Sequence, residues 1–319
     1  MQKIILYVLL AMTSFIAQSR AEQEQGNNPA RQTIKATSDF QGLVKTPFPI
    51  SLETTIDGTH FVATDKKIYV LPDIMIPEHT NIEPETKARL QSLMDNNRCT
   101  FYQTRTPDLG RINRMNQTIA HLECGKDKIW IEGQLVREGL AIVWPTIGNT
   151  ELIGDLLSLE NKARLDKIGL WKDDTIKIQD AESIKSHLNS KQIIQAKVYN
   201  ASLTRDMLYL NFEQDWKKDF SIGIAPNLQR EISRKNISLQ SLKGQTIRVR
   251  GWVRDYNGPF IDLETIDQLE ILETSQEKPT SNSKPGMKSI SNPVTPTVES
   301  PQEPETPKPE TIKEGQGDK

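Results

Sequence analysis

The segment from Gly133 to Trp171 constrains the fold more than any other part of the chain. A strand runs into a short helix, and a second strand, a loop and an amphipathic helix follow, ending at Gly169-Leu170-Trp171. The segment therefore alternates between short apolar runs, which predict strands, and stretches whose apolar residues recur every three to four positions, which predict helices. This order predicts a mainly β module (α+β class) with helices packed on the sheet.

Strand patterns also precede this segment. A turn pattern at Asp65-Lys66 separates two of the predicted strands, and Pro84 suits the first turn of a helix. The elements predicted upstream are strands at residues 51–64, 66–74, 98–102 and 119–124 and a helix at residues 83–96.

Cys99 and Cys124 are the two cysteines of the chain, and they lie in strands predicted to be neighbours. Opposed positions on antiparallel strands bring such a pair within bonding range, and an oxidising compartment favours a disulfide. Two buried free thiols are the alternative. A zinc site is disfavoured, because no pair of histidines accompanies the two cysteines.

The first 21 residues have the pattern of a signal peptide. Lys3 precedes an apolar run from Ile4 to Met12, and Ser19-Arg20-Ala21 offers a cleavage site after Ala21. An uncleaved anchor is the alternative, but the run is shorter than the roughly 20 residues that a spanning helix needs. We therefore expect a secreted or periplasmic protein without a transmembrane domain after cleavage.

The remaining chain divides by composition. Residues 22–50 are polar and predict an extended lead-in, and residues 174–190 predict a polar connector. Residues 191–272 carry five strand patterns, with a helix pattern at 227–235 between the third and the fourth, which is the order of an OB fold. Residues 273–319 are rich in Pro, Ser, Thr, Glu and Lys and predict a disordered tail.

The segment from Gly133 to Trp171 resembles the second half of the thermonuclease family, the staphylococcal-type nucleases. The resemblance spans about residues 51–173 and implies an OB-like barrel with helices and calcium-dependent phosphodiester hydrolysis. That chemistry needs carboxylates for the metal, a carboxylate base and arginines for the phosphoryl charge.

The family's metal-binding residues are replaced here. Its DGDT turn corresponds to Asp57-Gly58-Thr59-His60, with Thr59 at a metal carboxylate position. Its RLLGIDTPE strand falls on residues 69–78, where the arginine becomes Val70 and the second metal carboxylate becomes Met75. Ile76 replaces the threonine that follows. Glu78 remains at the position of the family's general base.

The second catalytic arginine has two possible alignments. One places Gln117 at its position and matches Arg114 to the motif's first, non-catalytic arginine; the other keeps Arg111 but requires an extra loop. Asp57, Asp73 and His79 are close enough in sequence to suggest a shifted metal site. The resemblance otherwise implies no cofactor, or calcium if the protein is active.

The region 191–272 is similar to the small C-terminal domain of exported alphaproteobacterial relatives. The matching segments are YLNF at 209–212, Asp215-Trp216, Asp219-Phe220, IRVRGWV at 247–253 and NGP at 257–259. Within it, Arg248, Arg250, Trp252 and Arg254 alternate with small or apolar residues, so they share one strand face. A basic face with an aromatic side chain is typical of single-stranded nucleic-acid binding, although a structural or protein-docking face is the alternative.

Two functions fit these observations. The first is an exported, catalytically degenerate, thermonuclease-like binding module for nucleic acid or an envelope partner such as an envelope protein. The second is an active secreted nuclease with a rearranged site that uses Glu78. The net charge of -2 indicates that any basic surface is local.

Overall fold

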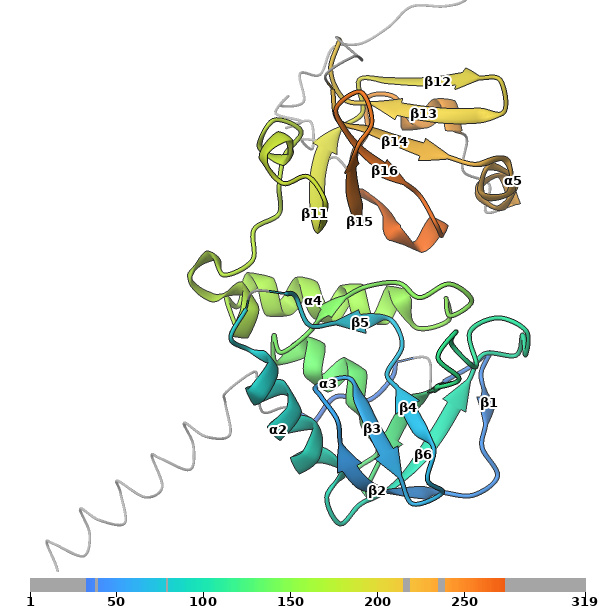
Figure 1. The fold of residues 1–319 in the computed structure, drawn as a ribbon, viewed down its shortest axis with the longest axis vertical. Helices are drawn as coiled ribbons and strands as arrows, with labels where there is room; N and C mark the ends of the chain where they lie inside the picture. The colour runs from blue at the N-terminus through green and yellow to red at the C-terminus, as the bar shows by residue number, and fades with distance from the viewer. Residues whose placement is uncertain (1–32, 38–39, 79, 215–218, 235–238, 273–319) are drawn as a thin grey trace, which may run out of the picture. The chain divides into compact units, whose positions relative to one another are not determined.

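The structure is a computed structural model that describes residues 33–37, 40–78, 80–214, 219–234 and 239–272. Within these residues the fold is mainly β with helices, as the sequence predicted, and it contains two separate β-sheet systems (Figure 1). The predicted signal peptide and the predicted disordered tail lie outside the described residues. No described helix has the length and apolar character that crossing a membrane requires.

The N-terminal module, residues 33–173, is built on an eight-stranded sheet with the order β7-β4-β3-β2-β6-β8-β9 and with β1 paired to β6. The strands are antiparallel except for the parallel pair β4 and β7. The bounds are β1 (Val44–Lys45), β2 (Ile50–Thr55), β3 (His60–Ala63), β4 (Ile68–Val70), β6 (Arg98–Gln103), β7 (Thr118–Ile119), β8 (His121–Cys124) and β9 (Ile129–Trp130).

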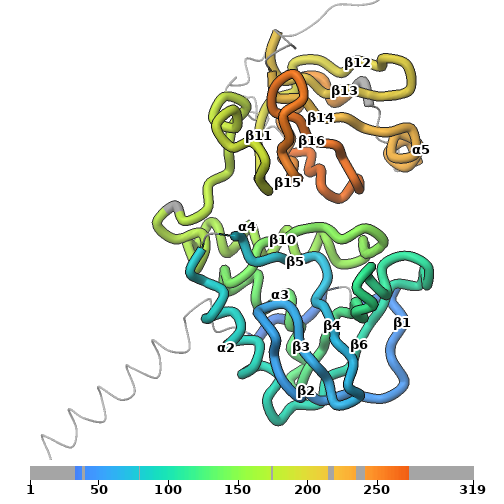
Figure 2. The backbone as a smooth tube through the Cα atoms, in the orientation of Figure 1, coloured from blue at the N-terminus to red at the C-terminus, as the bar shows by residue number. Residues whose placement is uncertain are grey.

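Two short strands, β5 (Ile74–Met75) and β10 (Ile142–Val143), form a separate antiparallel pair beside this sheet (Figure 2). Residues 51–64, predicted as one strand, form the hairpin of β2 and β3 instead. The chain reverses at Asp57-Gly58, where the aspartate accepts backbone hydrogen bonds that a continuous strand would not allow.

Three helices accompany the sheet: α2 (Glu83–Met94), α3 (Ile131–Arg137) and α4 (Ile153–Leu165). Helix α2 begins where the sequence predicted, with proline in its first turn, and it buries Leu90, Leu93 and Met94. It ends before Asn96, which has a positive φ of 58°. Helices α3 and α4 lie next to each other (Figure 1).

Part of the predicted lead-in belongs to this core. Phe40 is buried, and its ring stacks on Tyr102 with centroids 4.1 Å apart. The backbone N–H of Trp130 donates to the carbonyl of Ile34 over 2.8 Å. Phe40 and Leu43 are therefore packed in the core, whereas the other described residues of this segment are partly or fully exposed.

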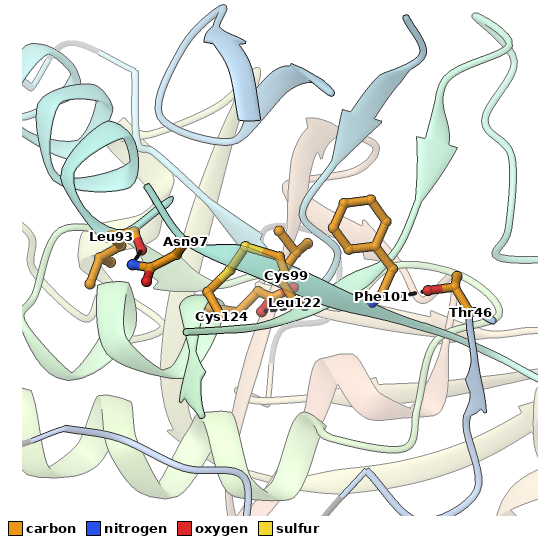
Figure 3. The surroundings of a disulfide bond; sticks show 8 residues. Thr46, Leu93, Asn97, Cys99, Phe101, Leu122 and Cys124 are labelled. Carbon is orange, nitrogen blue, oxygen red and sulfur yellow. Dashed lines mark hydrogen bonds between the residues drawn. A yellow bond between two sulfur atoms is a disulfide. The ribbon is translucent and has the colours of Figure 1, made fainter. Parts of the chain in front are cut away.

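Cys99 and Cys124 lie directly opposite each other on β6 and β8, with Cα atoms 4.1 Å apart, and they form a disulfide (Figure 3). Both are fully buried in the core of the N-terminal module. The bridge joins the β6–β8 pair close to the end of α2, where Asn97 donates from Nδ2 to the carbonyl of Leu93 over 2.9 Å.

The C-terminal module, residues 190–272, is a second β system with the order β11-β15-β16-β14-β13-β12. Only residues 198–199 separate β11 from β12, so the two ends of this order come from consecutive segments of the chain. Strand β14 pairs with β16 in parallel. This is the predicted OB order. The bounds are β11 (Ser190–Lys197), β12 (Asn200–Thr204), β13 (Met207–Asn211), β14 (Ser221–Ile224), α5 (Pro226–Arg234), β15 (Thr246–Asp255), β16 (Pro259–Asp262) and β17 (Leu269–Leu272).

Short 3₁₀ turns complete both modules: η2 (Gly169–Asp174), η3 (Ser183–Ser186), η4 (Leu239–Leu242) and η5 (Ile266–Gln268). The predicted polar connector contains η3, and Ile184 from this turn is fully buried in the core of the C-terminal module. The connector is thus anchored at its second half, which shortens the free span between the two modules.

Candidate functional site

The β2–β3 turn lies against the segment that follows β5. A Cβ on Gly58 would lie 2.3 Å from Cδ1 of Ile76 and 2.8 Å from Cγ2 of Thr86. The Ile76 side chain therefore occupies the space beside the turn. The β2–β3 turn and the segment after β5, which align with the family's metal motifs, are thus adjacent in space. The hydrocarbon side chain of Ile76 fills the space between them.

Asp57 is committed to its own turn. Its Oδ1 accepts the backbone N–H groups of Thr59 and His60, both over 2.7 Å, and His60 Nδ1 lies 3.0 Å away. Partial burial by itself raises the pKa of Asp57, but the hydrogen bonds from His60 and Thr59 outweigh it and lower the pKa to about 2. The carboxylate is therefore ionised and serves as a turn cap.

The replaced positions hold side chains with other partners. The Thr59 hydroxyl lies 3.1 Å from Asp57 Oδ1, so it also belongs to the turn. Val70 is in β4, paired with His60 and with Ile119. Met75 pairs with Ile142 across β5 and β10 and packs on an apolar cluster. None of these three side chains carries a carboxylate.

Glu78, which aligns with the family's general base, follows β5, and its side chain is 72% exposed. Its Oε1 lies 4.0 Å from Nζ of Lys191, which is on β11 of the C-terminal module. The two residues line a pocket of about 380 Å³ together with Met75, Pro77 and Trp252. The pocket beside Glu78 is thus lined by residues of both modules.

The positions aligned with the family's second arginine motif, Arg111, Arg114 and Gln117, lie in the loop before β7. Gln117 accepts from Asn113 Nδ2 over 2.6 Å within the tight turn before β7. Arg111 donates from Nε to the carbonyl of Thr104 over 2.7 Å, so its guanidinium closes its own loop. Arg114 is exposed in the same turn as Gln117. The structure shows no hydrogen bond or ion pair between Glu78 and either arginine among the described contacts.

A charged cluster that the sequence did not predict lies inside the N-terminal module. His121 Nε2 is 3.5 Å from Asp73 Oδ2, and His121 Nδ1 is 3.4 Å from Glu132 Oε1. All three side chains are fully buried. The Asp73 backbone has a φ of 62°, and its Oδ1 accepts the N–H of Thr146 over 2.8 Å.

Burial dominates the titration of this cluster. It raises the pKa of Asp73 to about 7, because the carboxylate loses its hydration and the neighbouring Glu132 adds negative charge. For His121, burial alone would lower the pKa, but Glu132 and Asp73 outweigh it and the pKa is raised. The cluster therefore holds its protons to a higher pH than the unfolded chain does.

A second buried cluster joins the modules. Arg250 on β15 is 0% exposed and donates to the carbonyl of Val143 over 2.8 Å, to Glu160 Oε2 over 3.0 Å and to Glu270 Oε1 over 2.6 Å. Glu160, on α4, also accepts the N–H of Val143 over 2.7 Å. Burial lowers the pKa of Arg250, but Glu160 and Glu270 outweigh it, so the guanidinium stays charged.

Two of the arginines considered for nucleic-acid binding on β15, Arg248 and Arg250, are buried, as the structural alternative for this face expects. Arg248 is buried and donates to Gln195 over 2.8 Å, in addition to its contact with Glu270. Trp252 is exposed, and Arg254 is partly exposed and paired with Asp262 over 2.6 Å. The alternation along the strand is as predicted, but acidic partners on α4 and β17 neutralise the face.

No group of three or more His, Cys, Asp or Glu side chains in the described part of the chain is arranged to hold a metal ion. Asp73 faces the interior and Asp57 caps its turn; His79, the third residue of the suggested shifted site, lies outside the described residues. The sequence contains little that predicts the buried cluster. His121 lies between apolar residues of its strand, and no local pattern identifies Asp73 or Glu132 as its partners.

Comparison with known proteins agrees with this architecture. An OB-like sheet with α2, α3 and α4 beside it is consistent with the fold that the resemblance implied. Residues 71–173 match the model of the family described as staphylococcal nuclease homologue. This part of the chain is therefore similar to the staphylococcal nuclease family. No curated protein matches the chain.

Proposed function

We propose that this protein is a catalytically silent member of the staphylococcal nuclease family that acts as a binding module. The observation that carries this proposal is the contact between Ile76 and Gly58 at the place where the family holds its metal. Thr59, Met75 and Ile76 offer a hydroxyl, a thioether and a hydrocarbon there. Calcium takes six to eight oxygen ligands, so these residues do not fit the ion, and we derive no step through it.

The electrostatics support the same conclusion. Hydrolysis of a phosphodiester builds negative charge on the phosphoryl oxygens, and an arginine at that point contributes a factor of about 10³ to 10⁵. Val70 stands at the first arginine position, and the second is Gln117 or, in the alternative alignment, Arg111, whose Nε donates to the carbonyl of Thr104. Glu78 would supply only the base, without the metal ion and the arginines that stabilise charge on the phosphoryl group. Its neighbour across the pocket is Lys191.

The position of the second module adds a steric argument. Trp252 and Lys191 line the same pocket as Glu78 and Met75. The buried pairing of Arg250 with Glu160 holds β15 in this position. Trp252 and Lys191 would block a nucleic-acid strand that approached Glu78 from this side. The outward surfaces of both modules remain available for a partner.

A nuclease assay tests the proposal. The mature chain, residues 22–319, is incubated with fluorescently labelled single- and double-stranded DNA and RNA, with excess calcium at alkaline pH. We expect no cleavage above the blank, because the loss of one transition-state donor already costs about 10²- to 10³-fold. Glu78→Gln and the exposed Glu85→Gln should both leave this background unchanged.

The opposite result would support the active-nuclease alternative. That result is cleavage that a chelator abolishes and that Glu78→Gln removes while Glu85→Gln retains it. We further propose export by the N-terminal segment to a secreted or periplasmic location, which the Cys99–Cys124 disulfide supports, since disulfides persist in oxidising compartments. N-terminal sequencing of protein recovered outside the cytoplasm would test this.

A further inference from the structure

The C-terminal module has a groove that lies outside the nuclease-type cleft. It crosses β12, β13 and β14 and ends at the β15–β16 hairpin, with a volume of about 490 Å³. This volume is within the range of small-ligand sites. Its lining consists of Asn200, Ser202, Thr204, Tyr209, Asn211, Ser221, Tyr256, Asn257 and Phe260.

The floor of the groove is aromatic and fixed. Phe260 is 3% exposed, and its ring lies over Gly223, where a Cβ would be only 2.6 Å from Cζ of the ring. Tyr256 stands edge-on to Phe260 with centroids 5.4 Å apart, and Tyr209 is tilted against it at 6.3 Å. Tyr256 is 52% exposed, so a flat apolar ligand face can reach its ring.

The walls are neutral hydrogen-bonding groups. Strand register places Asn200 beside Asn211 and Asn211 beside Ser221, and it places Ser202 beside Tyr209. The Ser221 hydroxyl donates to Asn211 Oδ1 over 3.0 Å, which orients this amide and directs its NH₂ group to other partners. Amides and hydroxyls provide both donors and acceptors.

Arg254 lies beside the aromatic rings of the groove, and its positive charge is paired with Asp262. Arg254 has its Cζ 4.6 Å from the ring centroids of both Tyr256 and Phe260, and its Nε donates to Asp262 over 2.6 Å. The arginine therefore stiffens the aromatic platform while its charge is paired. None of the described residues that line the groove is charged. A polyanion requires unpaired cations, so the groove does not match a phosphate backbone.

We propose that this groove binds a neutral oligosaccharide of hexose or N-acetylhexosamine units. A pyranose ring presents a face of C–H groups that packs on an exposed aromatic ring, and a rim of hydroxyls that pairs with amides and hydroxyls. This inference deepens the proposed binding role, and it rests on that role only in taking the protein as a binding module. It does not depend on the state of the nuclease-type cleft.

Titration calorimetry of the mature chain with chitohexaose, maltohexaose, cellohexaose and a twelve-residue oligothymidylate tests the proposal. We expect at least one sugar to bind, with an affinity that changes little with added salt. Tyr256→Ala should weaken this binding by about tenfold or more, the scale of losing one stacked ring. Tyr199→Ala is the matched control, because Tyr199 is 51% exposed and lies outside the groove.

Three outcomes would overturn the proposal: no sugar binds, Tyr199→Ala and Tyr256→Ala weaken binding equally, or only the oligothymidylate binds with a steep salt dependence. The nuclease assay is separate, so cleavage without sugar binding and sugar binding without cleavage are distinguishable results.

Discussion

The two buried ionic clusters of this protein differ in how well their charges are paired. Arg250 makes close hydrogen bonds to Glu160, Glu270 and a backbone carbonyl. In the other cluster His121 lies 3.4 and 3.5 Å from its carboxylates, and both of its ring nitrogens have no hydrogen-bond partner in the described structure. Close pairing makes a cluster a structural link, whereas loose pairing makes it responsive to protonation.

Arg250→Leu should have the largest effect on stability. It removes the guanidinium and leaves Glu160 buried without its cation, while Glu270 keeps only the longer contact with Arg248. Breaking a buried pair in this way costs about 3–5 kcal/mol in the free energy of unfolding. Urea unfolding followed by tryptophan fluorescence measures the loss. The control is Arg254→Leu on the same strand, whose pair with Asp262 is more exposed and contributes about 1 kcal/mol or less. Equal losses for both variants would contradict the link.

Reduction of the disulfide should come next and should affect the N-terminal module alone. The bridge closes a separation of 25 residues, and the chain-entropy model gives it about 3 kcal/mol. We expect Cys99→Ala with Cys124→Ala to lower the unfolding midpoint. The double variant should become insensitive to a reductant that destabilises the parent. If the reductant leaves the unfolding of the parent protein unchanged, the disulfide does not stabilise the N-terminal module and the prediction is wrong.

The loosely paired cluster predicts a stability that falls as pH rises. Folding raises the pKa of Asp73 from its ordinary value of 3.8 to about 7, so the stabilising proton is fully present below about pH 4 and is lost as the pH passes 7. The raised pKa of His121 acts in the same direction above its ordinary value of 6.5. The slope reaches at most about 1.4 kcal/mol per pH unit for each proton.

Asp73→Asn tests this slope, since asparagine tolerates the positive φ at this position. Unfolding in urea at about pH 5 and about pH 8 should show a smaller difference for the variant than for the parent. Asp127→Asn, at an exposed turn, serves as the control and should keep the parental difference. An unchanged slope in Asp73→Asn would mean that other groups dominate.

Asp57 should give the smallest effect and the opposite sign. Its pKa is lowered to about 2, so its contribution is present above 3.8 and is lost as the pH falls toward 2. The side chain is partly exposed, and solvent screening limits the effect of Asp57→Asn to less than about 1 kcal/mol. Acid unfolding followed by circular dichroism measures it; a shift as large as that of Asp73→Asn would contradict the assignment of Asp57 as a turn cap.

Local patterns predicted the local structure well. The OB strand order, the start of α2 and the opposition of Cys99 and Cys124 follow from periodicity, proline position and strand pairing, which depend on neighbouring residues. The apolar pattern continues on both sides of Asp57-Gly58, so it does not reveal the hairpin between β2 and β3. The two apolar side chains Phe40 and Leu43 are too few to predict that their segment contacts the core.

The site depended on contacts that no local pattern contains. The alternation of β15 correctly placed its arginines on one face, but Glu160 is 90 positions away from Arg250 and belongs to the other module. The partners of Asp73 are likewise distant along the chain. Ionic pairing between remote segments therefore decided whether a basic strand face was open or buried.

The Ile76 side chain against Gly58 has a consequence for ancestry. Replacing Ile76 by the family's threonine would open a void beside the turn, and restoring a carboxylate at Thr59 or Met75 first would set that charge against hydrocarbon. Under the proposed function, each single substitution toward the family's metal-binding residues would therefore first lower the stability of the N-terminal module. The Ile76 side chain would in this way oppose the return of a metal site at the turn.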